Sequence, residues 1–96
     1  MYAALSMVTL GPGMRSTAEK VCDQFAPVFR GLKGFKSMTF MLDDTVGDLA
    51  ALILWETKED AKAASAAVGS RSEQAVSGIA KGPITRRVFE VYEPKA

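Results

Sequence analysis

Residues 48–57 of the chain read DLAALILWET. The seven consecutive apolar residues at 49–55 are too few to cross a membrane as a helix, and too uninterrupted for a strand with one solvent-exposed face. We therefore expect a β-strand that is buried on both faces. A helix should begin directly afterwards, because the Thr57 side chain can cap the backbone N–H of Asp60, and Asp60 can reach back to Thr57 in a capping box.

The composition is that of a folded, globular chain. Its 96 residues are 48% hydrophobic and 24% charged, which excludes a disordered or low-complexity protein and fits one domain over residues 1–96. The net charge of +1 provides no overall field for nucleic acid or an anionic membrane, so we expect neither as a partner. Cys22 is the single cysteine, and Met1 leads into a strand-like segment without the features of a signal peptide. We therefore expect a cytoplasmic protein.

The sequence contains no histidine. Histidine is the commonest general base near neutral pH and the commonest protein ligand of transition metals. We therefore expect no bound metal and no histidine acting as a general base.

The chain before the quoted stretch begins with a strand and a helix. Residues 2–10 are largely apolar in both alternating sets, which predicts a second central strand, and the GPG sequence at 11–13 predicts a turn. Apolar residues spaced by three and four predict a helix over residues 14–32, with Cys22 as an inert thiol in its buried stripe. Pro27 should kink this helix or make it restart as a short second segment, and Gly31 or Gly34 should end it.

A further strand and an acidic loop complete this part of the chain. Residues 35–43 alternate as a strand, and residues 43–48 read DDTVGD, which favours a hairpin loop. The acidic residues of this loop do not match the spaced oxygen ligands of a calcium-binding loop. We therefore interpret them as solvated turn residues.

The chain after the quoted stretch should contain helix and strand. Residues 58–68 are rich in Ala and predict a short helix, which Gly69 should interrupt. Residues 70–73, SRSE, offer another capping box for a second helical piece over residues 74–80. The last strand should run from residue 84 to about residue 93, with charged groups on both faces.

This order, β-α-β-β-α-β, predicts a ferredoxin-like α+β fold. The right-handed crossover rule places the first and third strands in the middle of a four-stranded antiparallel sheet, in agreement with their apolar character on both faces. Two helices can cover only one face of such a sheet. A second copy of the chain is the simplest cover for the other face, so we expect a homodimer through the open sheet face.

Two other classes of protein built on this plan lack their motifs here. An RNA-recognition domain would carry aromatic residues at the stacking positions of its third strand, whereas this chain has LIL at 52–54. A copper chaperone needs paired cysteines in its first loop, and this chain has only Cys22, inside the predicted helix. RNA binding and metal transfer are therefore not expected.

The residues around Trp55 resemble a known family. Residues 52–61, LILWETKEDA, are similar to the signature of strand, Trp-Glu and then helix in the antibiotic biosynthesis monooxygenase-like family. The FAP sequence at 25–27 and the pair Gly34-Phe35 also resemble that family's pattern. The order of segments matches over nearly the whole chain. This resemblance implies a dimeric α/β barrel with a pocket between the sheet and helices of each subunit.

The resemblance also implies an activity. Family members with known activity include cofactor-independent oxygenases acting on polycyclic phenols or quinols, and a branch that degrades haem. The haem-degrading branch uses an Asn in the first strand, a Trp on the second helix and a later His. This chain has Ser6 in the first strand, no Trp in the second helical region and no His, so that route is not expected. Without His, proton removal from a phenol falls to Tyr, to water or to an Arg that favours the ionised substrate.

Five residues are candidates for binding a substrate, and no catalytic residue is assigned. They are Ser6, Trp55, Arg86, Arg87 and Tyr92. Trp55 can stack on an aromatic ring and orient an oxygen atom through its N–H, or it can anchor the core or a dimer interface. Tyr92 can donate a proton or pack at an interface.

The two arginines are adjacent on the last strand, so they must point to opposite faces of the sheet. An inward guanidinium would stabilise a phenolate or carboxylate. The alternative roles are an intersubunit salt bridge or a charge that protects the sheet edge.

Two functions remain open. The first is a cofactor-independent monooxygenase acting on a small aromatic or polycyclic phenol or quinol. The second is a non-catalytic dimeric α/β barrel that binds a small apolar ligand or serves as an assembly module. The resemblance favours the first function, and the missing His favours the second.

Overall fold

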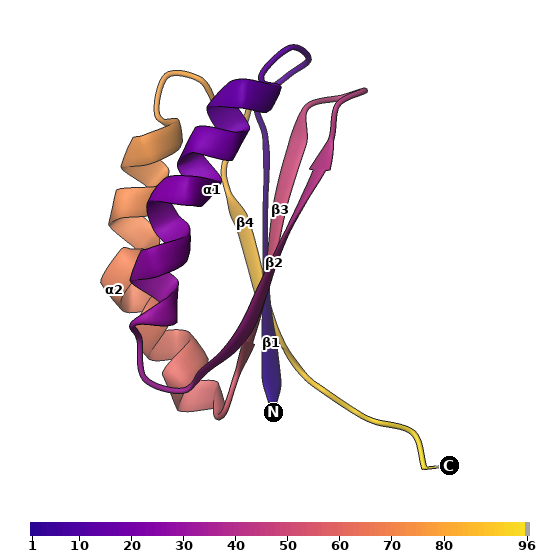
Figure 1. The fold of residues 1–96 in the computed structure, drawn as a ribbon, viewed down its shortest axis with the longest axis vertical. Coiled ribbons are helices and arrows are strands. Elements are labelled where there is room, and N and C mark those ends of the chain that lie inside the picture. Colours follow the sequence, from indigo (N-terminus) through magenta and orange to yellow (C-terminus); the bar gives the residue numbers. More distant parts are fainter. Residues whose placement is uncertain (96) are drawn as a thin grey trace.

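The computed structural model describes residues 1–95, which form a four-stranded sheet with two helices on one of its faces (Figure 1). The elements are β1 (Tyr2–Thr9), α1 (Arg15–Arg30), β2 (Phe35–Asp43), β3 (Asp48–Trp55), α2 (Lys58–Val76) and β4 (Thr85–Glu90). The strand order is β2-β3-β1-β4, and all neighbouring strands are antiparallel. The predicted ferredoxin-like fold, with the first and third strands in the middle, is confirmed.

The start of α2 lies at the predicted residue. The Thr57 side chain accepts a hydrogen bond from the backbone N–H of Asp60 at 3.1 Å. The expected return bond from the Asp60 carboxylate is not among the hydrogen bonds of residues 1–95. That carboxylate is instead packed against Gly34, where an added Cβ would overlap it. Gly34 also has a φ of +81°, so both the backbone conformation and the close approach require glycine.

The prediction that α1 could restart at Pro27 is wrong, because one helix runs from Arg15 to Arg30. Proline lacks the N–H that would bond to the carbonyl of Asp23, four residues earlier. Pro27 and Asp23 are both exposed, so water can bind this carbonyl. The helix ends at Gly31, one of the two predicted positions.

The predicted interruption of α2 at Gly69 is also wrong. The helix continues to Val76, and Ser72 Oγ donates a hydrogen bond to the Gly69 carbonyl at 2.8 Å. One glycine inside a helix costs about 1 kcal/mol relative to alanine. The buried face of α2 continues on both sides of Gly69, through Val68 and Val76, and this packing outweighs that cost.

The last strand is shorter than predicted, because β4 ends at Glu90. Beyond it, the backbone N–H of Val91 still bonds to the Met1 carbonyl at 3.0 Å. The following residues leave the sheet, and Figure 1 shows them passing the N-terminus on the side away from the helices. Tyr92 on this segment is 76% exposed.

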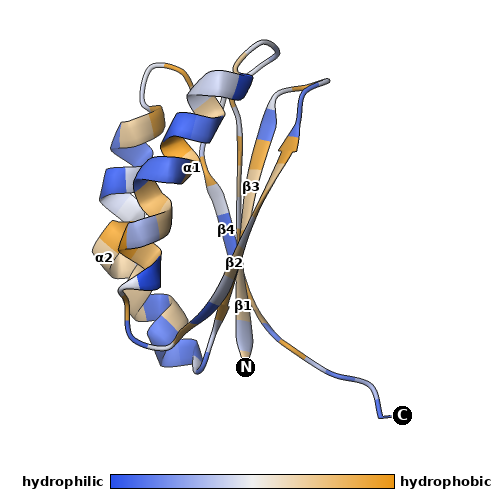
Figure 2. Cartoon of the chain, in the orientation of Figure 1, coloured by the Kyte–Doolittle hydropathy of each residue, from blue (hydrophilic) through white to orange (hydrophobic). Residues whose placement is uncertain are grey.

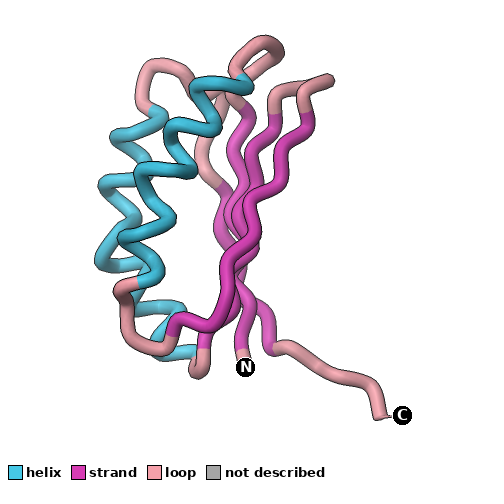
Figure 3. The backbone as a smooth tube through the Cα atoms, viewed as in Figure 1, coloured by secondary structure: helices cyan, strands magenta, loops and turns pink. Residues whose placement is uncertain are grey.

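The core between the sheet and the helices has two parts. Figure 3 shows the helices and strands as two layers, and Figure 2 shows apolar sequence along β2 and β3. One cluster of buried residues comprises Val8, Leu10, Ala18, Cys22, Leu49 and Val76. The other comprises Ile53, Trp55, Ala61 and Ala64. Cys22 thus lies in the core as predicted, and burial raises the pKa of its thiol.

The opposite sheet face, which we call the open face, carries apolar side chains without a helix over them. Leu5 on β1 pairs with Leu52 on β3, and both alternate with residues that face the helices. Met7, Met41 and Phe89 are each about 40% exposed. No helix within residues 1–95 is long and apolar enough to cross a membrane.

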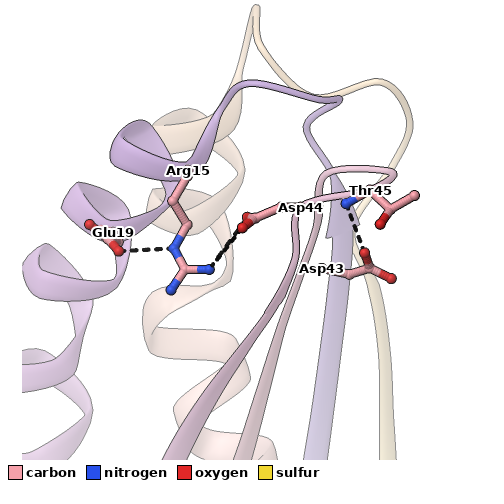
Figure 4. Close-up of polar contacts among 5 residues, drawn as sticks. All are labelled: Arg15, Glu19, Asp43, Asp44 and Thr45. Carbon is pink, nitrogen blue, oxygen red and sulfur yellow. Dashed lines mark hydrogen bonds and ion pairs between the residues drawn. The ribbon is translucent and has the colours of Figure 1, made fainter.

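The acidic hairpin loop between β2 and β3 is tied to the start of α1 (Figure 4). Arg15 forms ion pairs with Glu19 at 2.9 Å and with Asp44 at 3.3 Å. Asp43 accepts a hydrogen bond from the backbone N–H of Thr45 at 2.9 Å, as a turn residue does. The acidic residues drawn there therefore hold the loop itself and its contact with α1.

Candidate functional site

A cavity of about 100 Å³ lies between the sheet and the two helices. Its wall includes Val8 and Leu49 from one core cluster, and Ile53 and Ala64 from the other, so it separates the two clusters. An engineered apolar cavity of about 150 Å³ binds benzene, whereas typical small-molecule sites measure about 300–1,000 Å³. The cavity is smaller than both, so at most one aromatic ring could occupy it without rearrangement of its wall.

Trp55, at the end of β3, forms part of this wall. Its side chain is 1% exposed, and Phe29 and Phe35 hold it with edge-on contacts at ring-centroid distances of 6.5 and 6.0 Å. The indole Nε1 is buried without a hydrogen-bond partner among residues 1–95. An unsatisfied buried donor costs about 1–3 kcal/mol, so a ligand oxygen that accepted this bond would recover that free energy.

Arg86 supplies positive charge at the same cavity. It lies on β4 directly opposite Ser6 on β1, and both side chains line the cavity. Arg86 Nη2 donates to Ser72 Oγ at 2.7 Å and to the Gly69 carbonyl at 3.4 Å, and Nη1 donates to Glu73 Oε1 at 3.3 Å. Its side chain is 29% exposed. Arg86 therefore joins β4 to α2 at the edge of the cavity.

Three of the five predicted site residues, Ser6, Trp55 and Arg86, line the cavity. Ser6 is paired with Arg86, whereas Trp55 lies four residues along β3 from Ala51, the residue paired with Ser6 on that strand. Arg87 points to the open face, where its guanidinium lies 4.6 Å from the centre of the Phe89 ring. Arg87 and Tyr92 are not among the residues that line the cavity. The functional roles assigned to all five residues stay predictions.

The sequence reasoning missed the groups on α2 that hold Arg86. Gly69, Ser72 and Glu73 are spaced by three and four, which places them on one face of a continuous helix. The signal was therefore present in the sequence. This spacing was not recognised because we expected the helix to be interrupted at Gly69. Ser72 and Glu73 were then assigned to a separate capping box.

The cavity wall offers few chemically active groups. Arg86 is the only ionisable side chain among the described residues that line it, and the remaining polar side chains are Ser6, Ser65, Ser72 and the Trp55 indole. Such a set can bind and orient an oxygen atom, including a negatively charged one. It offers no carboxylate or imidazole as a general base.

Comparison with known proteins gives matches among structures only. The sequence matches no model of a protein family and no curated protein. The structure matches a candidate antibiotic biosynthesis monooxygenase from Deinococcus radiodurans with a TM-score of 0.82 at 12% sequence identity, covering 100% of this chain and 97% of that one.

Two further matches are crystal structures of Streptomyces proteins. SnoaB from Streptomyces nogalater, described as a cofactor-independent oxygenase, has a TM-score of 0.74 at 16% identity and covers 97% of this chain and 93% of its own. A monooxygenase from Streptomyces coelicolor, in complex with nanaomycin D, has a TM-score of 0.73 at 17% identity and covers 99% of this chain and 90% of its own. The resemblance to the antibiotic biosynthesis monooxygenase family is thereby confirmed at the level of the fold.

Proposed function

We propose that this protein is a cofactor-independent monooxygenase whose substrate is a small aromatic phenol or quinol bound in the cavity. The observation that carries the proposal is the buried, unpartnered Nε1 of Trp55 in the wall of an apolar cavity that Arg86 also lines. Buried polar groups in native proteins almost always have a partner. A phenol oxygen would supply the missing acceptor, while the ring of the phenol filled the apolar part.

The arrangement of charge supports the same ligand class. Arg86 is the only ionisable side chain among the described residues of the cavity wall, so it can donate a charge-assisted hydrogen bond to a ligand oxygen and stabilise negative charge that develops there during the reaction. An ionised phenol reacts with oxygen more readily than a neutral one because its ring is richer in electrons. Two of the structures with the same fold are described as a cofactor-independent oxygenase and a monooxygenase, which also supports the proposal.

The reaction balances without an added reductant. A phenol with a ring C–H para to its hydroxyl group reacts with O₂ to give a quinone and water. The ring carbon gains one oxygen atom, and the other oxygen leaves as water with the C–H and O–H hydrogens. The four electrons removed from the phenol reduce O₂ completely.

The test measures oxygen consumption with a panel of one-ring to three-ring phenols and quinols, after subtraction of their spontaneous oxidation, without added flavin or metal. Arg86→Gln removes a charge-assisted hydrogen bond worth about 1.5–3 kcal/mol, so kcat/KM should fall by about tenfold or more. Arg87→Gln is the matched control, because it removes the neighbouring charge from the open face. Absence of turnover with every compound, or equal losses in both variants, would contradict the proposal.

A second function is favoured by one observation, the lack of a general base among the described residues of the cavity wall. On this alternative, the protein is a non-catalytic α/β barrel that binds a small apolar ligand or serves as an assembly module. Trp55 is the chain's only tryptophan, so its fluorescence reports on the cavity. Quenching by phenols without any oxygen consumption would favour ligand binding alone. The absence of both quenching and oxygen consumption would favour an assembly module.

We further propose that the open face pairs with a second copy of the chain. Leu5, Leu52 and the exposed Met7, Met41 and Phe89 form a surface of a kind that is rarely left uncovered. Sedimentation at micromolar concentration should give a dimer. Leu52→Glu should give a monomer, whereas Ala66→Glu, on the exposed side of α2, should leave the dimer intact. A monomeric unmodified chain would contradict this pairing.

A further inference from the structure

The contacts of Arg86 occupy only part of its hydrogen-bonding capacity, but the ion pair with Glu73 offsets its positive charge. A guanidinium has five N–H donors, and Arg86 makes three contacts, with Glu73, Ser72 and the Gly69 carbonyl. Donors therefore remain for a ligand. The carboxylate of Glu73, however, already lies 3.3 Å from Nη1 and compensates the positive charge.

This combination discriminates between ligands by charge. An uncharged polar group at the Arg86 end of the ligand needs only a hydrogen-bond donor, which Arg86 retains. A permanently charged carboxylate needs an uncompensated positive charge to offset its loss of hydration in an apolar cavity. It would also meet the negative charge of Glu73 beside Arg86.

We propose that Glu73 determines the charge specificity of the cavity, so that uncharged phenols bind in preference to aromatic carboxylates. This inference rests on the proposed ligand site. Glu73 acts through Arg86 and is therefore a positioning residue. Its side chain is 64% exposed, so water and salt screen its charge and the effect is moderate.

The test compares 4-hydroxybenzoate with 4-hydroxybenzamide, two one-ring phenols of nearly the same shape that differ by one charge. Binding is measured by the fluorescence of Trp55. Glu73→Gln should tighten binding of the carboxylate by about threefold to fivefold at low salt and leave the amide within about twofold. The gain should shrink in about 0.5 M salt, because the interaction is screened. A purely structural role would not produce this dependence on ligand charge and salt.

Glu59→Gln is the control, because it removes the same charge from an exposed position in the first turn of α2. It should change neither affinity. If Glu73→Gln altered both ligands equally, or altered neither while both still bound, the charge specificity would be overturned and the proposed site would stand. If neither ligand bound to any variant, the proposed site would fall, and this inference with it.

Discussion

Replacing Trp55 with Phe tests the unpartnered indole donor directly. Trp55 is 1% exposed, and its Nε1 has no hydrogen-bond partner among residues 1–95. Phenylalanine keeps an aromatic ring at this position but has no donor. The change therefore removes a favourable packing contribution and an unfavourable polar one together.

The two contributions can be compared in magnitude. A phenyl ring buries roughly 50 Å² less than an indole, which is worth about 1.3 kcal/mol at about 25 cal/mol per Å². The space left behind costs about 1 kcal/mol more. Removing an unsatisfied buried donor recovers about 1–3 kcal/mol. The free energy of unfolding of Trp55→Phe should therefore stay within roughly 1 kcal/mol of the unmodified chain.

The assay is urea unfolding followed by circular dichroism, since the variant lacks the fluorescent indole. Trp55→Leu is the control, because it removes the donor and also the edge-on contacts with Phe29 and Phe35. Those two contacts are worth about 0.5–1.5 kcal/mol each, so Trp55→Leu should be about 2 kcal/mol less stable than Trp55→Phe. A loss of about 3 kcal/mol or more in Trp55→Phe would show that Nε1 has a partner in the folded protein. The reasoning behind the ligand contact would then be refuted.

Three further predictions concern stability. Gly47→Ala should lower the free energy of unfolding far more than Gly13→Ala. Both residues have φ near +80°, but only at Gly47 would an added Cβ overlap the carbonyl oxygen of Gly11. The urea midpoints of the two variants check this. Gly13→Ala alone should cost about 1 kcal/mol, which is the penalty of that backbone conformation minus the stabilisation that comes from the lower entropy of the unfolded chain. Gly69→Ala should raise the free energy of unfolding by about 1 kcal/mol, because no atom lies within 4 Å of an added Cβ, and a lower midpoint would contradict the continuous helix. Burial raises the pKa of Cys22, so its contribution to stability is complete below the unfolded-state pKa of about 8.5 and is lost as pH rises through the higher folded-state pKa. The stability of Cys22→Ala should accordingly fall less steeply above that pH than that of the unmodified chain.

Local sequence patterns predicted the order of elements and both central strands. Residues 49–55 and 2–10 are apolar on both alternating faces, which is typical of strands in the middle of a sheet, and β3 and β1 occupy these positions. The cap at Thr57 was equally predictable, because it depends on residues three positions apart. The breaks predicted at Pro27 and Gly69 were wrong. Proline or glycine ends a helix only where its cost exceeds the stabilisation from packing and solvation of the rest of the helix.

The two arginines show which features the sequence determines and which depend on the tertiary structure. Strand alternation by itself requires Arg86 and Arg87 to face opposite sides of the sheet. The pairing of Arg86 with Ser6, together with the packing of both helices on that side, places Arg86 at the cavity. A slip of one residue in the pairing of β4 would exchange the two. Register, the volume of the cavity and the missing partner of Trp55 arise from contacts between segments far apart in the sequence, and no local pattern contains them.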